Sequence, residues 1–476
     1  MQEYIVQLSK YFIVIFMALY TYEGFAVFRF KDEKSRSGIY LRQNILMFFI
    51  QFASFLTICI KSGDLEYLFF YGIVQLLLFG VIAMTNMLYP KSNRLLVNNM
   101  CMMLGIGFIM ISRLSFEQAM RQFIIVLFSF VIAFFIPYCI EKFKIFSKIR
   151  WIYAVVGVAA LSGVMILGQV THGSLISVTI AGVTFQPSEF VKIIFVFFLA
   201  ASLMQDTSFG NIVLTTIIAG IHVMILVASR DLGSALIFFV AFVMIVFVAT
   251  RNYLYLLMGV LGGSGAAVLA YNLFRHVQVR VQAWQDPWTY IDSQGYQVTQ
   301  SLFAIGSGSW FGMGLFAGTP DSIPYVEKDS IFSAVCEEMG VIFGLCLILI
   351  CISCFIMMMN ISLKLKDRFC QLAAYGLGVI YIFQVFLTIG GGIKFIPLTG
   401  VTLPLISYGG SSVLTTLIMF YLVQGFYILK QQEEEQRVQR PRKGNSNRNQ
   451  NKESDRIRQN KRNSFQIEES KDFYKA

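Results

Sequence analysis

Residues 232–249 read LGSALIFFVAFVMIVFVA, a stretch without a single charged side chain. A helix needs about 20 apolar residues to cross the hydrocarbon core of a bilayer, and this stretch is apolar on every face, as contact with lipid requires. The rest of the chain has the same character, since 56% of its 476 residues are hydrophobic and only 14% are charged. Soluble domains carry about 25% charged residues, so the composition excludes an ordinary water-soluble enzyme.

The same criterion of length and hydropathy selects twelve further stretches. The sequence therefore predicts an all-α polytopic membrane protein with thirteen transmembrane helices. The predicted spans are 8–28, 40–60, 67–89, 96–112, 122–140, 152–170, 190–205, 211–229, 232–249, 253–271, 331–359, 370–390 and 411–429.

Lysine and arginine gather in alternate connections between these spans, and basic connections favour the cytoplasmic side of a membrane. Because the number of spans is odd, we predict an external N-terminus and a cytoplasmic C-terminus. The connections at 171–189, 272–330 and 391–410 then face outward. The basic residues in the alternate connections are Arg29, Lys31, Lys34, Arg36, Lys91, Arg94, Lys142, Lys144, Lys148, Arg150, Lys364, Lys366 and Arg368.

Two segments outside the spans differ in character. The connection 272–330 is unusually long, and long connections are usually functional; its tryptophans and glycines predict a folded cap at the outer interface rather than a disordered loop. The tail 431–476 carries 12 Lys/Arg against 8 Asp/Glu, an excess of +4 out of the chain's +11. With almost no apolar residues it should be disordered and contact anionic lipids. Nucleic-acid binding is not expected.

Polar side chains at membrane depth are costly, about 2.5–3.5 kcal/mol each on insertion scales, so they mark candidate sites. In QPSEFVK (186–192), Pro187 suits the first position of a helix, Glu189 lies where the helix dipole favours an anion, and Lys192 shares its face. One interpretation is a capped helix with an internal ion pair. The other is a cation that meets an anionic lipid head group at the outer surface.

Other outward-facing polar residues allow similar alternatives. Arg230, Asp231 and Arg121 lie at the outer ends of spans, where ordinary solvation competes with a binding role. Asp329 precedes the span 331–359, where it fits a helix N-cap. The segment KFIPLTGVTLPLISYGGSS (394–412) contains too many prolines and glycines for a straight span. It predicts a broken, re-entrant segment whose hydroxyl groups supply hydrogen bonds.

Four motifs, in this order, resemble those of the SEDS family (shape, elongation, division and sporulation), which includes RodA, FtsW and SpoVE. They are FQPSEFVK (185–192), DLGSALIFF (231–239), DPW followed by GYQVTQSLFAIGSGSWFGMGL (286–315), and PLTGVTLPLISYGGSS (397–412). The similarity covers about residues 96–430. It implies a ten-helix core at 91–430, to which residues 1–90 add three N-terminal helices.

The chain departs from the family pattern in two places. Before the QPSE motif, the family often has Gly-Ala-(basic)-x-Trp, whereas this chain has HGSLISVTIAG, without Arg or Trp. The usual Thr-Asp-Phe-Ile-Phe is Lys-Asp-Ser-Ile-Phe at 328–332, which keeps Asp329. The first departure puts substrate contacts in that loop in doubt, and the second leaves the family's aspartate in place.

The resemblance implies a peptidoglycan glycosyltransferase in the bacterial cytoplasmic membrane, beside a class B penicillin-binding protein. Its substrate would be lipid II, the undecaprenyl-pyrophosphate-linked precursor, polymerised into glycan strands at the outer face. By this resemblance Asp329 is the catalytic base that takes the proton of the acceptor hydroxyl. Lys192 and Arg121 offset charge on the leaving pyrophosphate. The other expected substrate-binding residues are Gln186, Ser188, Glu189, Ser407, Tyr408, Ser411 and Ser412.

A divalent cation, Mg or Mn, could share the task of charge compensation, although the sequence shows no cluster of His and Asp with ligand spacing. Two other functions remain open. A flippase for lipid-linked precursors would also have many spans, a broken helix and buried cations. A non-catalytic scaffold that recruits the transpeptidase would need no base. The shared motifs do not distinguish elongation, division and sporulation.

Overall fold

The computed structural model describes residues 2–30, 32–142, 144–167, 169–171, 174–180 and 183–435. Contacts divide the chain into residues 1–427 and 428–476, and the arrangement described here is that of the first unit. Its helices are α1 (Gln2–Ala26), α2 (Glu33–Ser62), α3 (Glu66–Leu88), α4 (Arg94–Leu114), α5 (Phe116–Lys142), η1 (Lys144–Ser147), α6 (Arg150–Leu167), α7 (Pro187–Leu203), α8 (Phe209–Ala228), α9 (Leu232–Thr250), α10 (Tyr253–Leu273), α11 (Arg275–Gln285), α12 (Tyr296–Gly308), η2 (Pro320–Ser322), α13 (Ile331–Met339), α14 (Val341–Lys364) and α15 (Arg368–Gly392), followed by a last helix, Gly410–Glu435.

The predicted fold class is confirmed. Eleven of the described helices are long and apolar enough to cross a membrane. The shorter apolar helices α6 and α7 correspond to the two remaining predicted spans. The last helix continues to Glu435, so the prediction that the disordered tail starts at residue 431 is wrong by one turn. The rest of that tail, residues 436–476, lies outside the described residues, and its contact with anionic lipids stays a prediction.

The predicted single span 331–359 is wrong, because it consists of two helices that meet at Gly340. Gly340 has a φ of +92°, in the left-handed region that favours glycine. A Cβ atom there would lie 2.5 Å from the carbonyl oxygen of Trp310 and 2.5 Å from the amide nitrogen of Gly312. The backbone of the cap therefore packs directly against the junction, and α13 forms a short helix of its own before α14 begins.

The connection before α7 was expected to be a loop, and it instead contains a small antiparallel sheet. Its strands are β1 (Gln169–Thr171), β2 (Ser174–Ile180) and β3 (Val183–Phe185), in the order β1-β2-β3. Thr171 pairs with Ser174, and Ile180 pairs with Val183. The β-branched residues in SLISVTI suit a strand, so the local sequence explains this departure.

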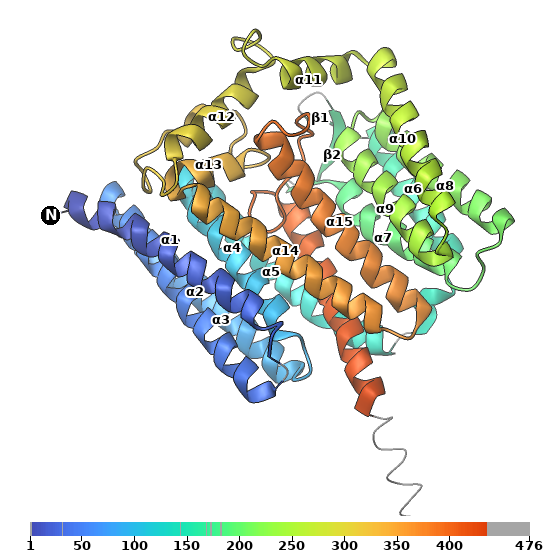
Figure 1. Ribbon diagram of the computed structural model, residues 1–476, viewed down its shortest axis with the longest axis horizontal. Coiled ribbons are helices and arrows are strands. Elements are labelled where there is room, and N and C mark those ends of the chain that lie inside the picture. Colours follow the sequence, from blue (N-terminus) through green and yellow to red (C-terminus); the bar gives the residue numbers. More distant parts are fainter. Residues whose placement is uncertain are drawn as a thin grey trace, which may run out of the picture. The chain divides into compact units, whose positions relative to one another are not determined.

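Helix α4 lies at the centre of the helix packing and is buried from Leu95 to Arg113. The N-terminal helices pack beside it (Figure 1), and some of their contacts with it are polar. Tyr20 of α1 donates to Asn99 of α4 at 3.2 Å, and Asn98 of α4 donates to Gln43 of α2 at 3.3 Å. Because lipid offers no hydrogen bonds, these contacts hold α1 and α2 to the rest of the bundle.

The long connection forms the folded cap that the sequence predicts. Helices α11 and α12 run across one end of the bundle (Figure 1). Lys10 of α1 donates to the carbonyl oxygen of Gly312 at 3.2 Å, and Trp284 of α11 donates to that of Lys394 at 3.1 Å. The start of α1, the cap and the segment between α15 and the last helix therefore lie at the same end. We call this the cap face.

Candidate active site

The QPSE motif begins α7 at the cap face. Gln186 occupies the N-cap position and Pro187 the first helical position, as expected from the fixed φ of proline. The Lys192 ammonium donates to Glu189 Oε2 at 2.7 Å and to Gln384 Oε1 of α15 at 2.7 Å. Both charged side chains are buried. The predicted ion pair is therefore present, and its cation is held deep in the protein rather than on the surface.

The segment predicted to be re-entrant has no helix between Ile393 and Gly409. Its backbone is held by buried side chains of α15, because Gln384 donates to the Thr402 carbonyl at 3.0 Å and Thr388 to the Val401 carbonyl at 2.9 Å. The segment also rests on α4, where a Cβ atom at Gly107 would lie 2.8 Å from the Ile406 carbonyl oxygen. Backbone groups that leave the helical pattern are thus satisfied by protein, as membrane depth requires.

The same segment fixes the backbone of the two residues that precede Asp329. The Ser407 hydroxyl donates to the carbonyl of Lys328 and accepts from the Leu403 amide at 2.8 Å. The Tyr408 amide donates to the carbonyl of Glu327 at 2.7 Å. Ser407 and Tyr408 therefore position the stretch that carries Asp329.

The N-cap interpretation of Asp329 is wrong, because Ser330 occupies the N-cap of α13. Instead, Asp329 Oδ1 accepts a hydrogen bond from Gln297 Nε2 of α12 at 3.0 Å. Its other oxygen faces Gly400, where a Cβ atom would lie 3.9 Å away. The carboxyl group is therefore not used in capping.

Burial controls the protonation of this carboxyl group. Only 9% of Asp329 is exposed, and loss of hydration raises its pKa from 3.8 to about 6. The hydrogen bond from Gln297 and the positive charge of Arg280 oppose this shift. A base with a pKa slightly below neutral is deprotonated at pH 7 and still takes a proton readily.

Arg280 of α11 lies near two acids, the half-buried Asp231 and the buried Asp329. Its guanidinium donates to the Thr399 carbonyl at 3.1 Å, and both Asp231 and Asp329 lie close enough to favour its charged form. Burial lowers the pKa of Arg280, although an arginine remains protonated near neutral pH. Burial likewise raises the pKa of Asp231, which also caps α9 through the Ser234 amide.

Further hydrogen bonds join the motifs to one another. Ser188 donates to Asp231 Oδ2 at 3.1 Å, so the QPSE motif contacts the start of α9. The Gln186 amide donates to the Ser411 hydroxyl at 3.0 Å, and Thr402 donates to Ser412 at 2.8 Å. Every motif singled out in the sequence therefore contributes to one cluster on the cap face. We define the active-site cluster as Ser188, Lys192, Asp231, Arg280, Gln297, Asp329 and Gln384 with the segment 399–407.

Arg121 is not brought into this cluster. Its side chain is 66% exposed and pairs with Glu117, which is 75% exposed, one helical turn earlier on α5. The next residue, Gln122, faces inward instead and donates to the Ser407 carbonyl at 3.1 Å. A helix turns about 100° per residue, so two adjacent side chains cannot both face the cluster. The structure places Arg121 on the outer surface.

The sequence analysis missed Arg280, Gln297 and Gln384. Arg280 carried a usable signal, since it is a cation in a connection predicted to face outward, against the usual bias. The two glutamines carried none, because neutral amides in apolar helices usually make structural hydrogen bonds. A buried ion pair was missed as well: Arg113 of α4 donates to Glu338 of α13 at 2.8 Å.

Among the residues that the structure describes, no group of three or more His, Cys, Asp or Glu side chains gathers as metal ligands. Asp231 and Asp329 both act on Arg280 and supply the cluster's carboxylates on either side of it. Mg²⁺ commonly uses one or two carboxylates together with substrate phosphates, and these two acids could serve in that way.

Comparisons with known proteins show to which family the chain is related. Similar proteins include the peptidoglycan glycosyltransferase RodA of Mycobacterium bovis, 30% identical over 74% of this chain and 82% of its own, and that of Mycobacterium leprae, 28% identical over 80% and 90%. The probable peptidoglycan glycosyltransferase FtsW of Buchnera aphidicola is 31% identical over 69% of this chain and 92% of its own.

Solved structures share the fold. One, described as a peptidoglycan synthase complex that coordinates polymerization and crosslinking, has a TM-score of 0.62 at 23% identity and covers 71% of this chain and 98% of its own. RodA of Thermus thermophilus has a TM-score of 0.54 at 21% identity, covering 71% and 96%. The model of the cell cycle protein family FtsW/RodA/SpoVE matches residues 68–432, beginning inside α3. The chain therefore belongs to the FtsW/RodA/SpoVE family.

Proposed function

We propose that this chain is a peptidoglycan glycosyltransferase that polymerises lipid II into glycan strands. The observation that carries the proposal is the Asp329 carboxyl group, which is buried, has a pKa of about 6 and lies next to Gln297 and Arg280. A hydroxyl group is a poor nucleophile at neutral pH, and a positioned base accelerates its attack by roughly 10²–10⁴-fold. Asp329 would take the proton from the acceptor sugar as its oxygen attacks the anomeric carbon of the donor.

The leaving group in this reaction is a lipid pyrophosphate, which departs without protonation but accumulates negative charge. The buried Lys192 and the half-buried Arg280 are the cations suited to offset that charge. Both are tied to the same short stretch, since Arg280 donates to Thr399 and Lys192 is linked through Gln384 to Thr402. A donor bound along residues 399–402 would meet both cations.

The predicted contribution of Arg121 is weaker in this proposal, because its side chain points to the outer surface. It would meet only a head group that approaches along the membrane. Gln186, Ser188, Glu189, Ser411 and Ser412 would act mainly by fixing α7 and the start of the last helix. A bound Mg or Mn ion would add positive charge at the pyrophosphate, and chelation by EDTA tests for that requirement.

The proposed reaction takes place at the outer face of the cytoplasmic membrane. The cap face carries the active-site cluster, and the basic connections join the opposite helix ends, which the positive-inside rule assigns to the cytoplasm. The N-terminus would then be external and the C-terminus cytoplasmic. Labelling of single cysteines introduced at the start of α1 and in the cap, with an impermeant reagent on intact cells, tests this orientation.

Incubation of the purified chain with lipid II in detergent tests the activity directly. Glycan strands should form with the original chain and not with Asp329→Ala. A flippase, the second candidate, needs a sealed membrane and would make no polymer in detergent. A scaffold would support growth even with Asp329→Ala. A class B penicillin-binding protein is the proposed partner, and its co-purification with the chain, together with stimulated polymerisation, tests that part.

A further inference from the structure

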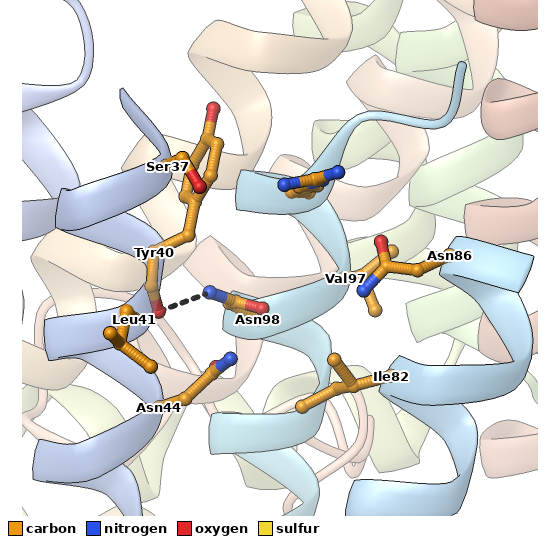
Figure 2. A pocket seen from close by; sticks show the side chains of 9 residues that line it. Ser37, Tyr40, Leu41, Asn44, Ile82, Asn86, Val97 and Asn98 are labelled. Atoms are coloured by element: carbon orange, nitrogen blue, oxygen red, sulfur yellow. Dashed lines mark hydrogen bonds between the residues drawn. The ribbon is translucent and has the colours of Figure 1, made fainter. Parts of the chain in front are cut away.

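A polar cavity lies far from the active-site cluster, between the N-terminal helices and the core. It has a volume of about 180 Å³ and is bounded by the first turns of α2, the last turns of α3 and the start of α4 (Figure 2). Ser37, Asn86 and Arg94 mark these three helix ends, and each lies beside a basic connection. The cavity is therefore at the end of the bundle opposite the cap face, at the depth of lipid head groups.

The cavity is lined by side chains that have hydrogen-bonding capacity to spare. Asn44, Asn86 and Asn98 converge on it from α2, α3 and α4 (Figure 2). The Asn44 Oδ1 atom is buried and has no hydrogen-bond partner. Buried polar groups are nearly always paired, and lipid cannot pair them. A polar ligand would satisfy the amides here.

The charge of the cavity selects the kind of ligand. Arg94 lines it, and the charges of both Arg94 and Arg36 reach the Tyr40 side chain on its wall. None of the nine lining residues, all within the described part of the chain, carries a carboxylate. A cationic or zwitterionic group would bring an ammonium next to Arg94 without any acid to compensate it. An anion is therefore the better fit.

Both hydrogen-bond donors and acceptors are available to that anion. Arg94 and the Asn86 amide NH₂ group can donate to phosphate oxygens, whereas the unpaired Asn44 Oδ1 needs a donor such as a hydroxyl. The volume of about 180 Å³ leaves room for a phosphate with a short polyol.

The surroundings point to a lipid as the source of this group. Leu41, which lines the cavity, is 62% exposed, and Met87, next to Asn86, is 80% exposed. Large apolar side chains this exposed at the ends of membrane helices contact acyl chains. A lipid could place its phosphate against the polar lining of the cavity and its acyl chains against the exposed apolar side chains of Leu41 and Met87.

We propose that the cavity between α2, α3 and α4 binds the phosphoglycerol head group of an anionic phospholipid from the leaflet on the side of the basic connections. The phosphate would lie at Arg94 and Asn86, and a glycerol hydroxyl would donate to Asn44. Such a lipid would fill the space between the N-terminal helices and α4 with hydrogen-bonding partners. Basic sites of this kind, between membrane helices near the cytoplasmic surface, are a known mode of lipid recognition.

Native mass spectrometry of the purified full chain, titrated with defined phospholipids, tests the proposal. The first dioleoyl phosphatidylglycerol should bind at least about tenfold more tightly, roughly 1.4 kcal/mol, than dioleoyl phosphatidylcholine or phosphatidylethanolamine, because those two lipids place an ammonium, and phosphatidylglycerol a hydroxyl, next to Arg94. Arg94→Gln and the near-isosteric Asn86→Asp should each remove the preference. Arg94→Lys should keep most of it. Lys364→Gln, an exposed charge at the same end of the bundle, is the matched control and should change nothing.

Three results would overturn the proposal. The first is equal affinity of the original chain for the three lipids. The second is an unchanged preference in both Arg94→Gln and Asn86→Asp, with both variants eluting as the original chain does. The third is displacement of phosphatidylglycerol by 10 mM inorganic phosphate, on the order of a weak anion site's affinity, which would assign the cavity to a soluble anion.

Discussion

Replacing Asp329 with Asn should abolish polymerisation and at the same time stabilise the folded protein. The amide keeps the size of the side chain and its acceptor for Gln297, which now bonds at 3.0 Å. It cannot take a proton, so the rate should fall by at least about 100-fold, the lower end of what a general base contributes. Activity of the original chain should fall about tenfold per pH unit below pH 6, as the carboxylate becomes protonated.

The effect on stability follows from the same pKa. A folded-state pKa of about 6 against 3.8 means that the folded state holds the proton more tightly than the unfolded chain. The associated stability is present below pH 3.8 and lost as the pH rises through 6. One pKa unit corresponds to 1.36 kcal/mol, so the buried carboxylate costs about 3 kcal/mol at pH 7. The Asn side chain avoids this cost.

Thermal unfolding in detergent should therefore show a higher midpoint for Asp329→Asn at pH 7, and this difference should shrink between pH 6 and pH 4. Asp329→Glu is the companion variant, since it keeps the charge and shifts its position. A polymerising Asn variant would refute the role of Asp329 as the base. An Asn variant that is less stable than the original chain at pH 7 would refute the argument that burial raises its pKa.

Three further results are expected. Lys192→Ala should reduce donor use in the lipid II assay more than Lys192→Arg does, because only arginine keeps the buried charge. Equal activity of the original chain and both variants would show that Lys192 does not belong to the site. Gly107→Ala should cut polymerisation sharply while the protein stays in the membrane fraction, because the added Cβ meets the Ile406 carbonyl at 2.8 Å; unchanged turnover would mean that the re-entrant segment tolerates displacement. Arg113→Met should lower the unfolding midpoint, since a lost partner of a buried pair costs about 3–5 kcal/mol, and adding Glu338→Gln should recover much of that loss, whereas no recovery would contradict the pairing.

The sequence predicted the helical fold well because hydropathy and length act locally. Each predicted span other than 331–359 corresponds to one helix, since about 20 apolar residues have few alternatives in a bilayer. The break at Gly340 was missed because the residues on both sides are equally apolar, and the cause lies in the backbone of the cap at Gly312. The sheet before α7 was missed because the stretch HGSLISVTIAG, which lacks the residues usual in the family, was interpreted as a loop.

The active-site cluster was only partly predictable for a related reason. Asp329 and Lys192 stand out because a charge near an apolar span is conspicuous. Arg280 becomes important only when α11 lies over Thr399, and no local pattern specifies that contact. Arg121 shows the opposite error, in which a charge at the correct end of a helix points the wrong way. The position of a residue along a helix can be predicted from the sequence. The direction in which its side chain points depends on how the helix packs against its neighbours.

The polar contacts of α4 with α1 and α2 have a consequence for the whole assembly. Tyr20 and Gln43 supply partners to Asn99 and Asn98, and Asn98 also donates to the Tyr40 carbonyl of α2. A shortened chain lacking the first two helices would leave Asn98 without these partners and Asn99 with only Ser353 of α14, at a cost of several kcal/mol for each group that lipid cannot satisfy. Helices α1 and α2 are therefore part of the packed bundle. A chain without them should associate with another membrane helix that covers the exposed surface of α4.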